Sequence, residues 1–199
     1  MRAQTRRVPC IFITGPVRSG KSRFAERLAR ERGAPVIYVA TARPDPGDPE
    51  MTARIAHHAA RRPPEWDVVE SAAPGAPSLA SLASEAAAAQ TLLVDSLGTW
   101  LADSMGQAFA RAGERAALDA RVLEEEAAAT AAALAGTRAL AIVVGDEVGW
   151  GVVPEYPSGR VFRDVLGRMQ QRLARSSERA HLVVAGYALD LHAGIAVEP

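Results

Sequence analysis

The sequence contains very little cysteine, few aromatic residues and no net charge. Cys10 is the only cysteine in 199 residues, which excludes an intramolecular disulfide and a zinc site with several cysteine ligands. The 23 Lys and Arg residues balance 23 Asp and Glu residues, so the chain lacks the overall field that attracts a protein to nucleic acid. An anionic ligand must therefore be bound by a local group of charges, and no nucleic-acid partner is expected.

Long apolar runs are also absent. The longest span about five to eight residues, against the roughly 20 that a membrane helix needs, so no membrane insertion is expected. Residues 1–8 carry arginines but lead directly into an apolar run, without the small-residue cleavage site of a signal peptide. These features predict a cytoplasmic protein. The length predicts one domain over 1–199, with a flexible start at 1–8.

Lysine is the scarcest charged residue. Of the 23 Lys and Arg residues, only Lys21 is a lysine. Lysine carries a compact point charge, whereas arginine carries a planar fork of donors. A chain that otherwise uses arginine and keeps one lysine indicates that this position needs a compact ammonium group.

Apolar runs rich in Ile, Val and Leu alternate with helical segments. Strands are expected at 11–14, 36–41, 92–95, 139–144 and 181–185, and helices at 21–32, 50–61, 79–90, 116–135 and 160–176. Continuous apolar character is typical of strands buried on both faces. The alternation predicts an α/β domain with a mostly parallel central sheet flanked by helices.

The clearest motif lies between the first strand and the first helix. It reads Gly-x-x-x-x-Gly-Lys-Ser, the pattern of a P-loop. In a P-loop the backbone N–H groups and the helix start surround phosphate oxygens, the lysine reaches the β- and γ-phosphates, and the serine hydroxyl binds Mg²⁺. The motif predicts a RecA-like P-loop NTPase fold with phosphates bound by Gly15, Pro16, Val17, Arg18, Ser19, Gly20, Lys21 and Ser22.

A carboxylate at Asp95 ends the apolar run 92–95. P-loop enzymes hold Mg²⁺ with a serine or threonine of the loop and an acidic residue on a neighbouring strand. Ser22 and Asp95 are therefore the expected metal ligands. An alternative role for Asp95 is to cap the next helix, and the two roles can coexist.

Two adjacent histidines lie in the predicted helix 50–61. Helical spacing places Arg54, His57 and Arg61 on one face and His58 near the border of an apolar stripe. Adjacent residues point about 100° apart, so the two histidines are not expected to serve the same phosphate. A neutral imidazole at His57 can attack phosphorus and form a phosphoramidate. Spacing alone favours the alternative, a solvated Arg/His face with one histidine packed against Trp66.

Several short motifs occur in a fixed order along the chain. They are Gly15–Ser22, Val36-Ile-Tyr-Val-Ala-Thr41, Arg54-Ile-x-His57-His58, Arg62-Pro63-x-x-Trp66, Glu70, Leu93-Val-Asp95, Glu147-Val-Gly149-x-Gly-Val-Val-Pro154-Glu155, Gly159-Arg160-x-Phe-Arg163-Asp164 and Leu182-Val-Val-Ala-Gly186. Together they resemble the bifunctional adenosylcobinamide kinase/adenosylcobinamide-phosphate guanylyltransferase family of cobalamin synthesis. The resemblance covers residues 9–189.

The resemblance implies two reactions. A kinase step moves a phosphate from ATP or GTP to adenosylcobinamide, and a transferase step uses GTP to convert adenosylcobinamide phosphate into adenosylcobinamide-GDP. A histidine of the family carries GMP covalently, and the matching residue is His57. The resemblance also implies a homo-oligomer, a trimer. It places guanine nucleotide on Ala40, Thr41, Ala42, His58, Ala59, Ala60, Arg61, Glu70 and Asp95.

Three segments depart from the family pattern. Asp146 stands where the family usually has Asn, Ser96-Leu97-Gly98 replaces a common Cys-Leu-Thr, and Met169-Gln170 replaces a common Asn-Gln pair. None of these positions lies in the P-loop or at His57. The departures therefore bear on substrate detail more than on the class of activity.

Several roles stay open at this stage. Glu147 is a metal or base residue or caps a loop, and Arg160 and Arg163 bind phosphate or lie on a solvated face. Rival functions are a small-molecule kinase without a covalent intermediate, a non-catalytic GTP-binding module and a recombinase-like ATPase. A GTPase-type module reads guanine with Asn-Lys-x-Asp, but the only lysine lies in the P-loop. The neutral charge disfavours the recombinase-like ATPase.

Overall fold

A computed structural model describes residues 8–45, 47–112 and 120–197. Within these ranges the chain forms one sheet in the order β3-β2-β4-β5-β1-β6-β7. Only the β6–β7 pairing is antiparallel. The strands are β1 Val8–Thr14, β2 Val36–Ala40, β3 Asp67–Glu70, β4 Thr91–Asp95, β5 Leu140–Val144, β6 Ser177–Val184 and β7 Tyr187–Asp190. The predicted α/β class with a mostly parallel sheet is confirmed.

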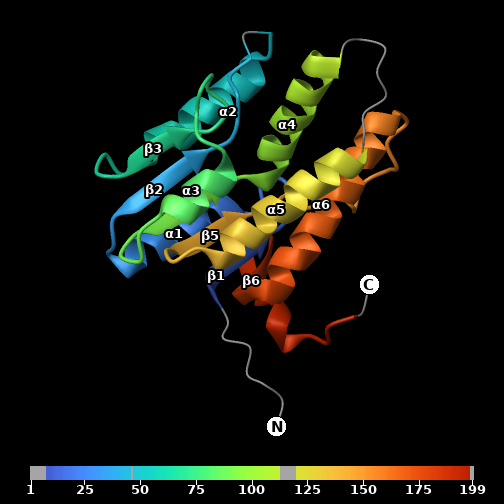
Figure 1. The fold of residues 1–199 in the computed structure, drawn as a ribbon. Helices are drawn as coiled ribbons and strands as arrows, with labels where there is room; N and C mark the ends of the chain where they lie inside the picture. The colour runs from blue at the N-terminus through green and yellow to red at the C-terminus, as the bar shows by residue number, and fades with distance from the viewer. Residues whose placement is uncertain (1–7, 46, 113–119, 198–199) are drawn as a thin grey trace.

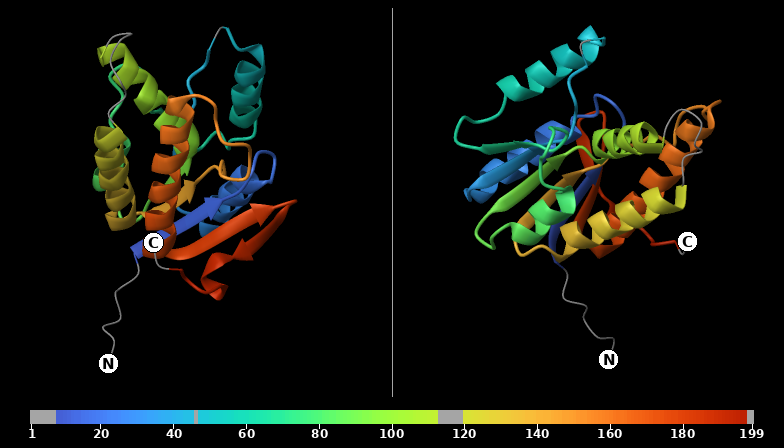
Figure 2. Two further views of the ribbon diagram at one scale, coloured as in Figure 1. Left: turned by 90° about the vertical axis from the view of Figure 1, so that its right-hand side faces the viewer. Right: turned by 45° about the horizontal axis from the view of Figure 1, so that its top comes forward.

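Helices cover both faces of this sheet (Figure 1). They are α1 Lys21–Arg32, α2 Pro49–Ala60, α3 Leu79–Glu85, α4 Leu97–Ala112, α5 Ala120–Gly136, α6 Pro157–Ser176 and a 3₁₀ turn at Leu191–Ala193. Helices α4, α5 and α6 lie on one side of the sheet and α1 on the other (Figure 2). Among the described residues, no helix is long and apolar enough to cross a membrane.

The core explains why the strands appear as continuous apolar runs. Along β1, Cys10 and Phe12 pack with α3, α5 and α6, whereas Ile11 and Ile13 pack with α1. A strand covered on both faces needs apolar residues at every position instead of every second one. Of the seven strands in the described residues, five were predicted from such apolar runs: β1, β2, β4, β5 and β6.

The two strands that the sequence did not predict lie at the edges of the sheet. The side chains of β7 are all exposed, and those of β3 are mostly exposed, so neither has an apolar run to reveal it. Helix α4 was also missed, although Leu97, Leu101 and Met105 follow helical spacing and are buried.

Several predicted boundaries are wrong. The helix expected at 79–90 ends at Glu85, and the strand expected at 181–185 begins four residues earlier, at Ser177. The helix expected from 116 is described from Ala120, and the earlier part of that prediction lies outside the described residues. The flexible start predicted for 1–8 also lies outside them, apart from Val8.

The topology brings three strand ends together. Asp95 ends β4 and pairs with Val144 at the end of β5, which in turn pairs with Ile13 of β1. Because these strands are parallel, the segments that follow them lie at one edge of the sheet, which is where α/β proteins bind ligands. The P-loop and Asp95 therefore meet at this edge.

Candidate active site

The P-loop turns tightly between β1 and α1. Gly20 adopts a left-handed backbone with φ of 99°, and Lys21 begins the helix. A Cβ atom on Gly15 would lie 2.2 Å from the carbonyl oxygen of Val183, so the loop is pressed directly against β6. The N–H of Gly186 donates to the carbonyl of Ser19 at 3.0 Å and secures the far side of the loop. Neighbouring backbone thus fixes the loop at both ends.

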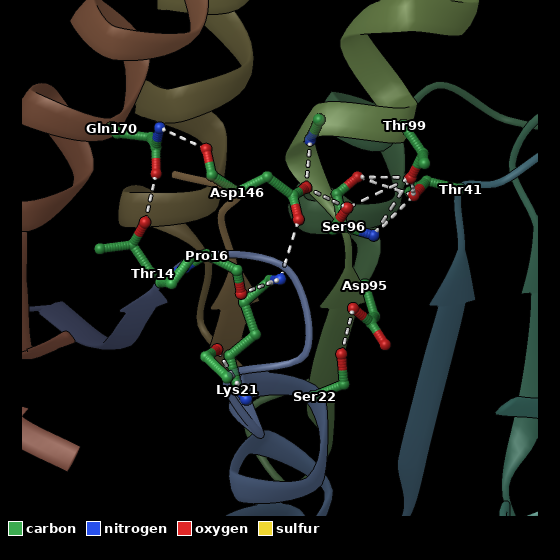
Figure 3. Close-up of polar contacts among 12 residues, drawn as sticks. Thr14, Pro16, Lys21, Ser22, Thr41, Asp95, Ser96, Thr99, Asp146 and Gln170 are labelled. Atoms are coloured by element: carbon green, nitrogen blue, oxygen red, sulfur yellow. Dashed lines mark hydrogen bonds and ion pairs between the residues drawn. The ribbon is translucent and has the colours of Figure 1, made fainter. Parts of the chain in front are cut away.

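Lys21 points along the loop toward the end of β5. Its ammonium group donates to the carbonyl of Pro16 at 3.3 Å and forms an ion pair with Asp146 at 3.1 Å (Figure 3). The N–H groups of Gly145 and Glu147 donate to the carbonyls of Ile13 and Gly15, so the chain after β5 is held against the loop. This backbone pairing places Asp146 beside the lysine.

Ser22 and Asp95 lie next to one another, as the metal-site hypothesis requires. The Ser22 hydroxyl donates to Asp95 Oδ1 at 3.1 Å, and the buried Tyr38 hydroxyl donates to Asp95 Oδ2 at 2.8 Å. His58 Nδ1 lies 3.6 Å from the same Oδ2 atom. Tyr38 was not predicted as a site residue, because its position in an apolar strand gives no sign of a polar partner.

The contacts around Asp95 keep its carboxyl group ionised. Burial by itself would raise the pKa of Asp95, but the contacts with His58, Tyr38 and Ser22 outweigh it and lower the pKa. The pKa of Tyr38 is raised, first by burial and then by the negative charge of Asp95, so its hydroxyl stays a donor. Among the described residues, no group of three or more His, Cys, Asp or Glu side chains is placed to hold a metal. A metal here would draw its remaining ligands from phosphate and water.

Helix α2 carries both histidines above this site. Asp48 caps its first turn by accepting from the Met51 N–H at 2.9 Å, and Pro49 occupies the first helical position. His58 is half-buried and faces Asp95, whereas His57 is exposed, with the two ring centroids 6.5 Å apart. The structure thus brings His58, and not His57, to Asp95, one of the two predicted metal ligands.

The end of α2 is tied to α1 by charge. Arg61 pairs with the buried Glu26 at 2.9 Å and lies 3.5 Å from His58 Nδ1. Arg61 was predicted to contact the nucleotide, whereas in the structure its guanidinium group pairs with the Glu26 carboxylate of α1. Trp66 stacks on Tyr38 and lies under the guanidinium group of Arg30.

The other predicted nucleotide contacts lie along adjacent strand ends. Ala40 pairs with Glu70 on one side and with Asp95 on the other. Thr41 is buried, and its hydroxyl donates to the carbonyl of Ser96 at 2.7 Å. Glu70 is exposed, and so are Ala59 and Ala60 at the end of α2. Ala40, Thr41 and Glu70 therefore lie at the same edge of the sheet as the P-loop, whereas Ala59 and Ala60 belong to α2.

The segment after β5 clarifies three residues whose roles were open. Glu147 accepts from the Gly149 N–H at 2.8 Å and therefore caps a turn. Arg160 donates to the carbonyls of Pro154 and Glu155, and Arg163 donates to those of Gly149 and Val152. Both arginines hold the loop that connects β5 to α6.

Two of the three departures from the family pattern meet in one place, because Asp146 accepts from the Ser96 hydroxyl and from the Gly98 N–H. In the third, Met169 packs in the hydrophobic core, whereas Gln170, which matches the family, donates from Nε2 to the Asp146 carbonyl at 3.2 Å. Gln170 also accepts from Thr14 at 2.7 Å. The sequence did not predict contacts between these segments, because their spacing along the chain does not indicate that they are neighbours.

Comparisons with known proteins identify the family of this chain. Residues 11–191 match the family model of cobinamide kinase / cobinamide phosphate guanyltransferase, CobU. The bifunctional adenosylcobalamin biosynthesis protein CobP of Pseudomonas aeruginosa is 40% identical over 180 residues, covering 90% of this chain and 95% of that protein. The CobU proteins of Salmonella typhimurium and Escherichia coli are 36% and 33% identical, each over 91% of this chain and 98% of the relative. The chain therefore belongs to the family of bifunctional cobinamide kinases and cobinamide-phosphate guanylyltransferases, as its ordered motifs predicted.

Proposed function

We propose that His57 carries GMP during the guanylyl transfer of this bifunctional enzyme. The kinase and guanylyltransferase activities are those of the family, which disfavours both a kinase without guanylyltransferase activity and a non-catalytic GTP-binding module. In the complete proposal, the enzyme first phosphorylates adenosylcobinamide with ATP or GTP. It then transfers GMP from GTP to adenosylcobinamide phosphate. The proposal is carried by a P-loop that ends in Lys21 and Ser22 beside Asp95, with α2 above it.

The P-loop supplies the phosphate grip for both reactions. Its backbone N–H groups and the N-terminus of α1 bind phosphate oxygens, and Lys21 neutralises charge on the β- and γ-phosphates. Much of this apparatus is pre-organised, because β6 and the segment after β5 hold the loop by backbone contacts. Such chemistry depends mainly on positioning and electrostatics.

Ser22 and Asp95 fit a magnesium site. Both present oxygen atoms, the donors that Mg²⁺ prefers, and these atoms lie 3.1 Å apart. Magnesium bound there would offset the negative charge of the triphosphate. Tyr38 would orient the Asp95 carboxylate by its hydrogen bond to the second oxygen.

His57 would form a bond to the α-phosphorus of GTP as the bond to pyrophosphate breaks. The phosphate of adenosylcobinamide phosphate then attacks the same phosphorus and releases the imidazole. None of the described residues of α2 is buried, so turning this helix to bring His57 inward breaks few packing contacts. By helical spacing Arg54 and Arg61 share the face of His57, and both would offset phosphate charge. Arg61 would first have to leave Glu26, with which it pairs at 2.9 Å.

Labelling with GTP that carries isotope in its α-phosphate tests this assignment. The wild-type protein should retain an acid-labile, base-stable label, and His57→Asn should lose it while its kinase rate is kept. His58→Asn is the matched control, because it removes the neighbouring imidazole and should still accept label. Stable labelling of His57→Asn would refute the role of His57.

The resemblance also supports a homo-oligomeric, cytoplasmic enzyme, and we expect a trimer. Light scattering coupled to gel filtration measures the mass of the assembly against the 21.0 kDa of one chain. A monomeric mass at micromolar concentration would contradict the trimer without affecting the assignment of His57.

A further inference from the structure

Three arginines gather where α2 ends, and one of them has no carboxylate partner. Arg61 pairs with the buried Glu26 at 2.9 Å. Arg30 lies 4.0 Å from the same carboxylate and donates to the Arg61 carbonyl at 3.0 Å. In the part of the chain that the structure describes, Arg62 forms no ion pair. Arg61 would have to leave Glu26 before it could bind an anion, whereas Arg62 has no carboxylate to leave.

The Arg62 side chain is half-buried and lies over an aromatic ring. Its guanidinium carbon is 4.1 Å from the centroid of the Tyr38 ring, within the range of a cation–π contact. Its Nε atom is buried and has no hydrogen-bond partner. A buried donor without an acceptor is unfavourable, and the planar guanidinium group matches the geometry of a phosphate. The packing therefore fixes a cation whose donors an anion would complete.

This cation lies near Asp95, on the side away from the P-loop. The Tyr38 hydroxyl donates to Asp95 Oδ2, whereas Ser22 of the P-loop donates to Oδ1. In the sheet, β2 with Tyr38 and β1, which leads into the P-loop, lie on opposite sides of β4. Arg62 and the P-loop are thus two separate positive groups on either side of the predicted metal ligand.

The sheet holds Arg62 independently of the body of α2. The helix ends at Ala60, so Arg62 lies outside it, and its backbone N–H donates to the Ala59 carbonyl at 3.2 Å. Its guanidinium group contacts Tyr38, a core residue that is 1% exposed. A turn of α2 about this end would move His57 and leave the charge of Arg62 at the sheet.

Guanylyl transfer brings two phosphates together, whereas the kinase reaction does not. The acceptor in guanylyl transfer is the phosphate of adenosylcobinamide phosphate, and it must approach the phosphorus of the GMP group while both are anionic. Like charges at such short range repel each other, and a cation beside them offsets the repulsion. In the kinase reaction the acceptor is a neutral hydroxyl, so this second phosphate is absent.

We propose that Arg62 binds a phosphate group of guanylyl transfer outside the P-loop, and the charge arrangement favours the acceptor phosphate. An acceptor oxygen forms a bond to the phosphorus of GMP while the bond from that phosphorus to the imidazole nitrogen breaks. The imidazole leaves with the electron pair, and Arg62 keeps its protons and its charge. This step rests on the proposed role of His57, but a comparison of the two steady-state reactions needs only the activities of the family.

Arg62→Gln tests the proposal when the two reactions are assayed separately. The KM for adenosylcobinamide phosphate should rise by about 10- to 100-fold, the scale of a lost hydrogen bond to a charged group. The KM for adenosylcobinamide and the kinase kcat should not change. Arg62→Lys keeps a cation over Tyr38 but lacks the planar fork, so it should recover part of the affinity. Unchanged guanylyl transfer, or equal losses in both reactions, would overturn the proposal.

Labelling from GTP with isotope in the α-phosphate identifies which phosphate Arg62 binds. Normal labelling of Arg62→Gln with slow release of the label to adenosylcobinamide phosphate assigns Arg62 to the acceptor. Slow labelling assigns it to the α-phosphate of GTP. Labelling and release that both proceed at wild-type rates would contradict phosphate binding. An unlabelled wild-type protein would refute the role of His57 and leave the steady-state comparison intact.

Arg30→Gln is the matched control. Arg30 also lies over an aromatic ring, 5.5 Å from the centroid of Trp66, but its charge already faces Glu26. The ratio of guanylyltransferase to kinase rate should therefore stay at the wild-type value in this variant. An equal fall of that ratio in Arg30→Gln would show a general effect of charge at the end of α2 and would count against a phosphate site at Arg62. Circular dichroism and thermal melting establish that each variant is folded.

Discussion

The two helices that follow β1 and β2 differ sharply in how they are held. Helix α1 buries Lys21, Ala25, Glu26 and Ala29 against the sheet, whereas none of the described residues of α2 is buried. The first helix carries the phosphate grip, and the second carries the proposed GMP carrier. Because His57 is exposed and faces away from Asp95, the proposed mechanism requires α2 to turn, while the P-loop stays in place.

The contrast extends to electrostatics. Lys21 pairs with Asp146, and Asp95 contacts Ser22, Tyr38 and His58, so the P-loop lysine and the neighbouring carboxylate each have polar partners within the protein. On α2, His57 is exposed to solvent. Substitutions near α1 should therefore affect stability and both activities, and substitutions on the exposed face of α2 should affect chemistry alone.

The largest effect is expected from Gly15→Ala. The added methyl group would lie 2.2 Å from the carbonyl oxygen of Val183, which belongs to a core strand and cannot move aside cheaply. Kinase and guanylyltransferase rates should both fall by more than about 100-fold, because one loop grips the phosphates in each reaction. Gly167→Ala is the matched control, since an added Cβ meets nothing within 4 Å there. Retention of either activity by Gly15→Ala would break the comparison.

An intermediate effect is expected from Tyr38→Phe. Removing the hydroxyl takes away a 2.8 Å hydrogen bond to a buried carboxylate, which should cost about 1–3 kcal/mol in the free energy of unfolding. The pKa of Asp95 should rise toward its ordinary value, and a higher Mg²⁺ concentration should be needed for half-maximal rate in both reactions. Urea unfolding and magnesium titrations measure the two effects. Unchanged stability with unchanged magnesium dependence would exclude a supporting role for Tyr38.

The smallest effect concerns pH and the packing of α1. His181 of β6 is buried, and its ring packs edge-on against Phe24 of α1, with the two ring centroids 5.3 Å apart. The pKa of His181 is lowered, first by burial and then by the positive charge of Arg179. The unfolded state therefore binds a proton more readily, so this residue should reduce stability as pH falls below about 6.5, the ordinary histidine value. Melting temperatures at pH 7.5 and 5.5 should differ less in His181→Phe than in the wild type. An equal or larger difference in His181→Phe would rule out this contribution.

Sequence patterns predicted the centre of the fold and the phosphate loop but not the edges. The sequence predicted β1, β2, β4, β5 and β6, because strands buried on both faces contain continuous runs of apolar residues. The sequence did not predict β3 and β7, because edge strands with exposed side chains lack such apolar runs. The P-loop was found because its chemistry needs residues at a fixed local spacing.

The sequence by itself determined the parts of this protein that depend on local order. These are the alternation of strands and helices, the P-loop with its only lysine, and the ordered motifs that identify the family. The tertiary structure alone decided that Tyr38 and His58 converge on Asp95, and that Ser96, Gly98 and Asp146 form one cluster with Lys21. The physical reason is that parallel strands gather distant segments at one edge of the sheet, and contacts across that edge leave no periodicity in the chain.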